Sequence, residues 1–240
     1  MPEGPFQLET ELLGALPIVN HFLSRLGVDD RLLRWVPAGD ASVRLAPAKA
    51  LGTALRCLCL RREPLYALAE WAAAYDAGLI GLLPEERELL NDDRVGRALA
   101  HLFDADRASL LTELIVAMIA TFEIDCTQLH NDSTTITFSG GYHEAKGQPR
   151  GGKATPAITH GHNKDHRPDL KQLLWILTVS ADGAVPLAYR TEPGNTNDDP
   201  THIPTWDGLV QLLGRVTFLY VALSRPCNYA DQACRRPQTA

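Results

Sequence analysis

The sequence predicts an α/β protein in which a helical half precedes a strand-rich half. Up to about residue 122, apolar residues recur at intervals of three and four, which is the period of amphipathic helices. From Asp125 onward they gather instead in short runs rich in Val, Ile and Thr, which favour strands. We therefore expect a helical domain over residues 1–124 and an α/β domain over residues 125–224. Residues 225–240 form a tail without apolar periodicity that continues neither pattern.

Composition narrows the class of protein. A chain of 240 residues is long enough for one large domain or two small ones, and its 45% hydrophobic and 22% charged residues are typical of soluble globular proteins. The longest apolar run, Leu114–Ala120, is too short to span a bilayer, and the N-terminus lacks the pattern of a secretory signal. The five cysteines include no C-x-x-C pair, which favours a reducing compartment over a disulfide framework. We therefore expect a cytoplasmic protein with no membrane contact.

Five helices are expected in the first half. Pro17 is followed by apolar residues at helical spacing and then by Gly27, which predicts a helix that ends at this glycine. The other helices are expected over residues 47–60, 65–75, 95–103 and 109–122, with Asn91–Asp93 and Asp104–Asp106 as capping clusters for the last two. Short connections predict a compact bundle. Acidic residues near any recognition helix favour a scaffold or oligomerisation role for this bundle over DNA contact.

The second half predicts the order strand, hairpin, helix, strand. Strands are expected over residues 125–138, 171–180, 185–190 and 216–223, with a helix over residues 202–213. The Asp182-Gly183 pair predicts the hairpin turn, and Pro186 weakens the start of the returning strand. A polar, glycine-rich loop is expected over residues 139–167. Asp198 and Asp199 are expected to cap the helix that follows them.

Asp132 is the residue of this half that draws most attention. A carboxylate in the middle of a β-branched strand is unusual, because burying an unpaired charge is costly. A catalytic or metal-binding role would explain it. A turn aspartate that bonds to Ser133 or Thr134 would explain it equally well, and from this segment alone both interpretations stay open.

Charge is distributed unevenly. The net charge of −6 argues mildly against nucleic acid, but residues 140–171 hold six Lys or Arg, three acids and four histidines. A locally basic loop can contact a phosphate backbone even on an acidic protein.

Four motifs in the second half carry a resemblance to a known family. They are HNDSTT at residues 130–135, THGHNKDHRPDLKQL at residues 159–173, TVSADGAVP at residues 178–186 and GNTND at residues 194–198. Together they resemble the insertion-sequence DDE transposases, over nearly the whole chain from about Leu12 to Tyr220. The resemblance implies that the strands form an incomplete ribonuclease-H-like mixed sheet. It also implies that the first half is the helical domain of uncharacterised function that such relatives carry.

The resemblance implies a catalytic site that this chain has in part. In the family, three acids hold two Mg²⁺ or Mn²⁺ ions, which activate water or a DNA 3′ hydroxyl. Asp132 matches the first acid, whereas Leu223 stands where the second is expected, and the third would lie beyond Ala240. Asp231 is the only acid after the last strand. We therefore expect a truncated or frameshifted transposase that does not hold the metal stably and does not catalyse DNA transposition.

The partners implied by the resemblance are DNA at transposon ends and a full-length transposase or a second copy of the chain. The loop and strand cations expected to contact phosphates are Lys153, Lys164, Arg167 and Lys171. A first alternative is therefore a non-catalytic remnant that binds DNA or interacts with a transposase. Asp165 and Asp169 are expected to pair with cations of the same loop.

A second alternative is a zinc-binding module. His160, His162 and His166, with His143 nearby, are suitable zinc ligands by residue type. Their H-x-H-x-x-x-H spacing fits no closed structural pattern, and no cysteine lies close to them in the sequence.

Overall fold

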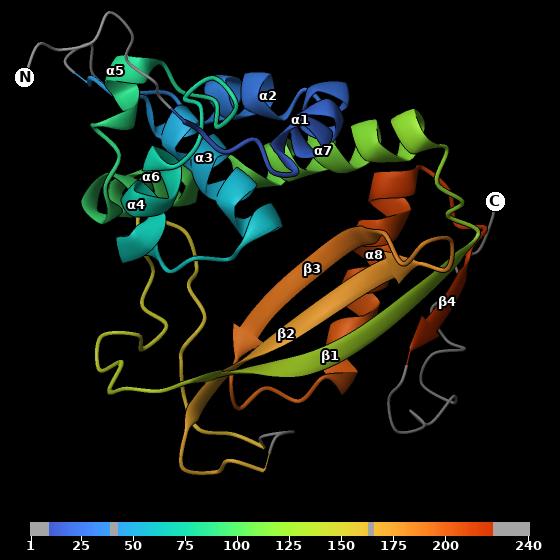
Figure 1. Ribbon diagram of the computed structural model, residues 1–240. Coiled ribbons are helices and arrows are strands. Elements are labelled where there is room, and N and C mark those ends of the chain that lie inside the picture. Colours follow the sequence, from blue (N-terminus) through green and yellow to red (C-terminus); the bar gives the residue numbers. More distant parts are fainter. Residues whose placement is uncertain (1–9, 39–42, 163–165, 223–240) are drawn as a thin grey trace, which may run out of the picture. The chain divides into compact units, whose positions relative to one another are not determined.

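The computed structural model describes residues 10–38, 43–162 and 166–222. The chain divides into two compact units, residues 1–121 and residues 122–240 (Figure 1). The first unit is helical and the second contains the strands, so the predicted mixed α/β class is confirmed. Within the part of the chain that the structure describes, no helix is long and apolar enough to cross a membrane.

The first unit is built from seven helices within the described residues, and α3 is the one with the most buried residues. The helices are α1 (Leu16–Arg25), α2 (Val28–Trp35), α3 (Pro47–Leu60), α4 (Leu68–Ala73), α5 (Pro84–Arg87), α6 (Asp92–Asp104) and α7 (Arg107–Phe122), with a 3₁₀ turn at Leu65–Ala67. The bounds predicted for α3 are confirmed. The single helix predicted over residues 65–75 is instead a 3₁₀ turn followed by α4. Helix α2 was not predicted, because Gly27 adopts φ 54° and both ends α1 and starts α2 without an intervening loop.

Two predicted capping clusters act as expected. The Asn91 side chain accepts the backbone N–H of Arg94 at 2.8 Å and so caps α6. The Asp106 carboxylate accepts the backbone N–H of Ser109 at 3.1 Å, and α7 therefore begins at Arg107, two residues earlier than predicted.

The core of the first unit forms where α3 meets its neighbours. Its central side chains come from α1, α3, α4, α6 and α7, and they include Leu16, Leu51, Leu68, Val95, Ala98 and Leu110. Eight residues of α3 are buried, more than in any other helix described. Burial of this apolar surface is the main stabilising contribution to the unit.

The second unit is a four-stranded mixed sheet with a crossover helix. Its elements are β1 (Gln128–Phe138), β2 (Lys171–Ser180), β3 (Pro186–Pro193), a 3₁₀ turn (Asp199–Thr201), α8 (His202–Leu213) and β4 (Leu219–Ala222). The strand order is β3-β2-β1-β4, with β1–β2 and β2–β3 antiparallel and β4 parallel to β1 (Figure 1). The predicted order of strand, hairpin, helix and strand is confirmed.

Strand β1 starts later than predicted. The Asp125 carboxylate accepts the backbone N–H of Thr127 at 2.8 Å and its hydroxyl at 2.9 Å, which makes a turn before the strand. These two hydrogen bonds, the backbone one above all, lower the pKa of Asp125. The ladder to β2 therefore begins at Leu129 rather than at Asp125.

Helix α8 packs on one face of the sheet. Tyr220 of β4 contacts two α8 side chains, with its hydroxyl 3.1 Å from His202 Nδ1 and its ring edge-on to Trp206. By the β1–β4 register Tyr220 lies beside Leu129, so the odd-numbered residues of β1 face α8. Burial raises the pKa of Tyr220 well above its usual value.

The face packed against α8 is rich in polar side chains. Asn131, Ser133, Thr178 and Ser180 are all buried there, and Thr178 donates to the Asn131 side chain at 2.9 Å. The opposite face, which we call the open face, alternates with it along each strand. Its central residues are His130, Asp132 and Thr134 of β1, Trp175, Leu177 and Val179 of β2, Tyr189 of β3 and Val221 of β4.

Two glycines of the quoted motifs are required by close backbone approach. A Cβ atom on Gly161 would overlap the carbonyl oxygen of Gly194, and one on Gly194 would overlap the carbonyl oxygen of Gln172. The buried Gln172 side chain joins both segments, because its Nε2 donates to the Gly194 carbonyl at 2.7 Å and to the His162 carbonyl at 3.2 Å. Thr159 and Gln172 exchange backbone hydrogen bonds of 2.8 and 3.2 Å. The end of the long loop is thereby fixed to β2.

Candidate functional site

Asp132 lies in the middle of β1 and is exposed on the open face. The expectation that its charge would be buried is therefore wrong, because the strand is covered on the other face only. Asp132 does not lie in a turn, since it pairs with Leu177 in a regular antiparallel ladder, but the bond to Ser133 that the turn interpretation expected is present. Its Oδ1 nevertheless accepts the backbone N–H of Ser133 at 2.8 Å, which orients the carboxylate.

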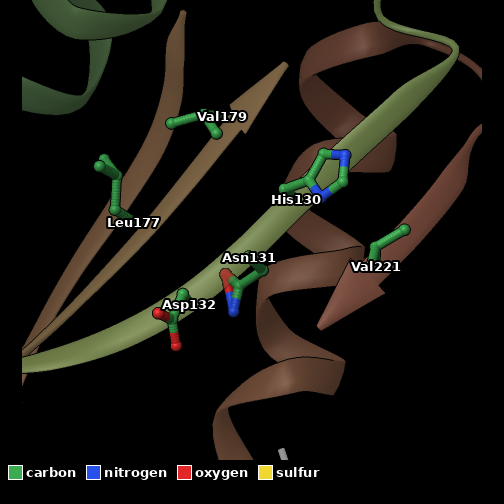
Figure 2. Close-up of a pocket in the computed structure, with 6 residues that line it drawn as sticks. All are labelled: His130, Asn131, Asp132, Leu177, Val179 and Val221. Carbon is green, nitrogen blue, oxygen red and sulfur yellow. The ribbon is translucent and has the colours of Figure 1, made fainter. Parts of the chain in front are cut away.

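A shallow pocket surrounds this carboxylate. Its volume is about 150 Å³, and its lining residues are His130, Asn131, Asp132, Leu177, Val179 and Val221. Figure 2 shows that the three polar residues come from β1, whereas β2 and β4 contribute only aliphatic side chains. The His130 ring nitrogen Nε2 lies 2.9 Å from Gln128 Nε2. The pocket thus offers one carboxylate and one imidazole beside an apolar wall.

The second acid implied by the family resemblance would come from the end of β4. Leu223, which stands at that position, lies outside the described residues, as do the tail at residues 225–240 and Asp231. In the described part, β4 runs parallel to β1 with Val221 beside His130 and Ala222 beside Asn131. Neither side chain has a ligand oxygen.

The residues around Asp132 do not fit a two-magnesium site. Magnesium requires several oxygen ligands, and carboxylates must lie on both sides of the phosphate in two-ion catalysis. Leu177 and Val221 occupy the neighbouring strand positions of the pocket. Among residues 10–38, 43–162 and 166–222, no group of three or more His, Cys, Asp or Glu side chains is arranged to hold a metal ion.

The four loop histidines considered as zinc ligands are all exposed. His143, His160, His162 and His166 belong to the described residues, and the structure does not bring three of them into such a metal-holding group. The backbone of His162 is held by the Gln172 side chain.

The cations predicted to contact DNA differ in their local structure: one is ion-paired, and the others lie in a turn, on a strand or outside the described residues. Arg167 donates two hydrogen bonds to Asp169, at 2.7 and 2.8 Å, so the predicted pairing of Asp169 is confirmed. This contact raises the pKa of Arg167 and lowers the pKa of Asp169. Lys153 lies in a turn paired with Arg150, and Lys171 starts β2 opposite Phe138. Lys164 and its neighbour Asp165 lie outside the described residues.

Asp198 does not cap α8 as predicted. A 3₁₀ turn at Asp199–Thr201 separates it from the helix, whose first turn has no side-chain cap. Its carboxylate instead accepts the Ser133 hydroxyl at 2.8 Å. Asp198 therefore lies on the α8 side of β1, next to Ser133, whereas Asp132 lies on the open face. Strict alternation along β1 could have shown that Ser133 faces the helix side, but nothing in the sequence identified Asp198 as its partner.

The fold and the site together define a mixed α/β protein with a carboxylate on the open face of its sheet. A family model described as a domain of unknown function (DUF4277) matches residues 8–116, which lie in the helical unit. No curated protein and no solved structure matches the chain.

Proposed function

We propose that this chain is a transposase-type protein of an insertion sequence, related to the DDE enzymes, and that it does not cleave DNA by itself. The observation that carries the proposal is the position of Asp132. It stands in the middle of β1, on the open face, next to a parallel strand reached through a crossover helix. The resemblance expects the second acid at the end of that parallel strand, whose last described residue, Ala222, lies beside Asn131.

Two further observations support the proposal. The order strand, hairpin, helix and parallel strand is the one that the ribonuclease-H-like resemblance implies. Gly161 and Gly194, which belong to two of the quoted motifs, meet at Gln172 of β2. The presence of glycine at these two distant motif positions thus has one structural explanation, which is their contact at Gln172.

The proposal that the chain is inactive follows from the surroundings of Asp132. One carboxylate beside Leu177 and Val221 cannot clamp two divalent ions. We expect purified chain with Mg²⁺ or Mn²⁺ to leave a duplex with a transposon terminal repeat intact. Leu223→Asp alone should not restore cleavage. Leu223→Asp joined to the C-terminal part of an intact relative, which carries the later Glu motif, should restore it.

The matched control is Asp132→Asn in the restored protein, which should abolish cleavage while the fold is retained. Metal-dependent cleavage by the chain itself, lost in Asp132→Asn, would overturn the inactive part of the proposal. A restored protein that folds but never cleaves the terminal repeat would overturn the transposase assignment.

A second candidate is a non-catalytic protein that binds transposon ends or an intact transposase. The excess of six cations over three acids in residues 140–171 favours it. In a gel-shift assay, Lys153→Gln should weaken binding to the terminal repeat and lower the salt slope by about 1. Arg167→Gln should have a smaller effect, because this guanidinium is already engaged by Asp169. Binding that is insensitive to salt and to Lys153 would argue against this candidate.

A further inference from the structure

A stacked aromatic pair lies on the open face of the sheet. The rings of Trp175 and Tyr189 are nearly parallel, with an interplanar angle of 15° and centroids 4.8 Å apart. The other ring pairs of the second unit within the described residues are tilted or edge-on. Tyr189 belongs to the edge strand β3 and keeps 43% of its surface exposed. The pair therefore leaves part of an aromatic ring accessible at the edge of the sheet.

The sheet leaves this surface without a helix from its own unit. Helix α8 packs on the opposite face through Tyr220, and it is the only α-helix described after residue 122. Apolar side chains lie on both faces, since Leu129 and Ile176 are buried under α8 while Leu177 and Val179 line the open pocket. An exposed surface of apolar and aromatic side chains is typical of a binding site.

Charge favours an anionic ligand that runs toward one end of this face. Asp132 is the one carboxylate that the described strands place on it. At the end where β1 stops, Phe138 pairs with Lys171, and the chain continues into residues 139–162, which hold Lys146, Arg150 and Lys153. A planar apolar surface followed by cations is complementary to a base followed by phosphates.

We propose that the open face binds single-stranded DNA, with an unpaired base extending the Trp175–Tyr189 stack on its Tyr189 side and the backbone directed toward Lys171. A four-stranded sheet with helices on one face and aromatic side chains on the other is an established way to bind unpaired bases. Base stacking tolerates any sequence, because every base has a planar π face. The choice of DNA over RNA rests on the proposed function, whereas the stacking platform rests on the geometry alone.

The test measures binding of the full chain to a labelled oligothymidylate of about 12 nucleotides by fluorescence anisotropy, a length within the range of a single-strand groove. Tyr189→Val removes the ring while placing a residue that also favours strands, and should weaken binding by about 5- to 100-fold. Tyr189→Phe keeps the ring and should bind as the wild type does. Tyr66→Val removes a tyrosine that is 80% exposed in the helical unit and should change nothing.

Circular dichroism establishes that each variant is folded, and Trp175→Val serves as a second ring-removing variant. If both folded variants bind the oligonucleotide as tightly as the wild type, the pair only stabilises the sheet and the proposal is overturned. Tighter binding of oligouridylate than of oligothymidylate would overturn the choice of DNA. A duplex terminal repeat is measured in parallel with the wild-type chain. A wild type that binds oligothymidylate but not the duplex counts against the proposed function, and one that binds the duplex but not oligothymidylate overturns the platform.

Discussion

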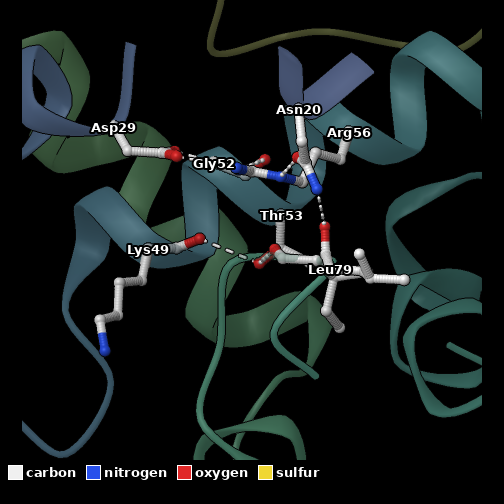
Figure 3. A network of polar contacts seen from close by, with 8 residues as sticks. Asn20, Asp29, Lys49, Gly52, Thr53, Arg56 and Leu79 are labelled. Carbon is white, nitrogen blue, oxygen red and sulfur yellow. Dashed lines mark hydrogen bonds and ion pairs between the residues drawn. The ribbon is translucent and has the colours of Figure 1, made fainter. Parts of the chain in front are cut away.

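Arg56 is the residue on which the polar interior of the helical unit depends. It is 4% exposed, and its guanidinium bonds to side chains of α1 and α2 and to the Gly52 carbonyl of its own helix. Its Nε donates to the Asn20 side chain at 2.7 Å, and its two terminal nitrogens donate to the Asp29 carboxylate at 2.7 and 3.0 Å (Figure 3). The Asn20 amide in turn donates to the Leu79 carbonyl at 2.8 Å. The guanidinium group is planar and always charged, and it is therefore suited to donating several hydrogen bonds in one plane.

Replacing this side chain should destabilise the unit measurably. Arg56→Met would leave Asn20 and Asp29 without their donor, and we expect a loss of about 2–3 kcal/mol in the free energy of unfolding. The upper values for buried pairs do not apply, because the Asp29 side chain is 48% exposed and can regain water. Urea denaturation would measure the change. Arg34→Met, which removes an exposed partner of Glu113, is the control and should cost less than about 1 kcal/mol.

At the scale of elements, the junction between the long loop and β2 depends on glycine rather than on side-chain packing. Ala at position 161 would press a methyl group against the Gly194 carbonyl, which accepts the Gln172 side chain. Ala at position 194 would press one against the Gln172 carbonyl, which cannot move without breaking the Thr159–Gln172 pairing. We expect Gly161→Ala and Gly194→Ala each to destabilise the second unit by about 1–3 kcal/mol. Gly208→Ala in α8 meets open space and should be neutral or stabilise by up to about 1 kcal/mol. A melting temperature of Gly208→Ala below those of the other two variants would contradict this account.

Helices and strands with a long, regular pattern of apolar residues could be predicted from the sequence, whereas the junctions between them could not. The bounds of α3, β2 and α8 follow from long apolar patterns with proline or polar residues at their ends. Helix α2 was missed because Gly27 serves two helices at once, which the usual rule for a helix stop does not foresee. Similarly, Asp132 could be singled out by residue type, but its exposure depends on which face α8 covers.

At the scale of the whole molecule, the chain consists of two units with different sources of stability. The helical unit has a continuous apolar core around α3, whereas the sheet has an open apolar face and an edge strand, β4, of four residues. Exposed apolar faces and unpaired strand edges promote aggregation. The segment between the units, at Glu123 and Asp125, is exposed.

Limited proteolysis should therefore separate the two units. We expect cleavage near Glu123 to release a resistant helical fragment of about residues 12–122, because the exposed segment is accessible to protease and the helical core is not. The strand-rich part should be poorly soluble or degraded further. Mass spectrometry of the digest would identify the fragments. A single resistant core that spans both halves would show that this expectation is wrong.

The polar character of the face beneath α8 has a thermodynamic consequence. Exposure of apolar surface on unfolding raises the heat capacity, whereas exposure of polar surface lowers it. Unfolding the sheet exposes Asn131, Thr178 and their polar neighbours from the covered face, while the aliphatic residues of the open face are partly hydrated already. Because Leu129 and Ile176 are exposed along with them, we expect only a modest effect: a heat capacity change per residue somewhat below that of the helical unit, which differential scanning calorimetry would measure.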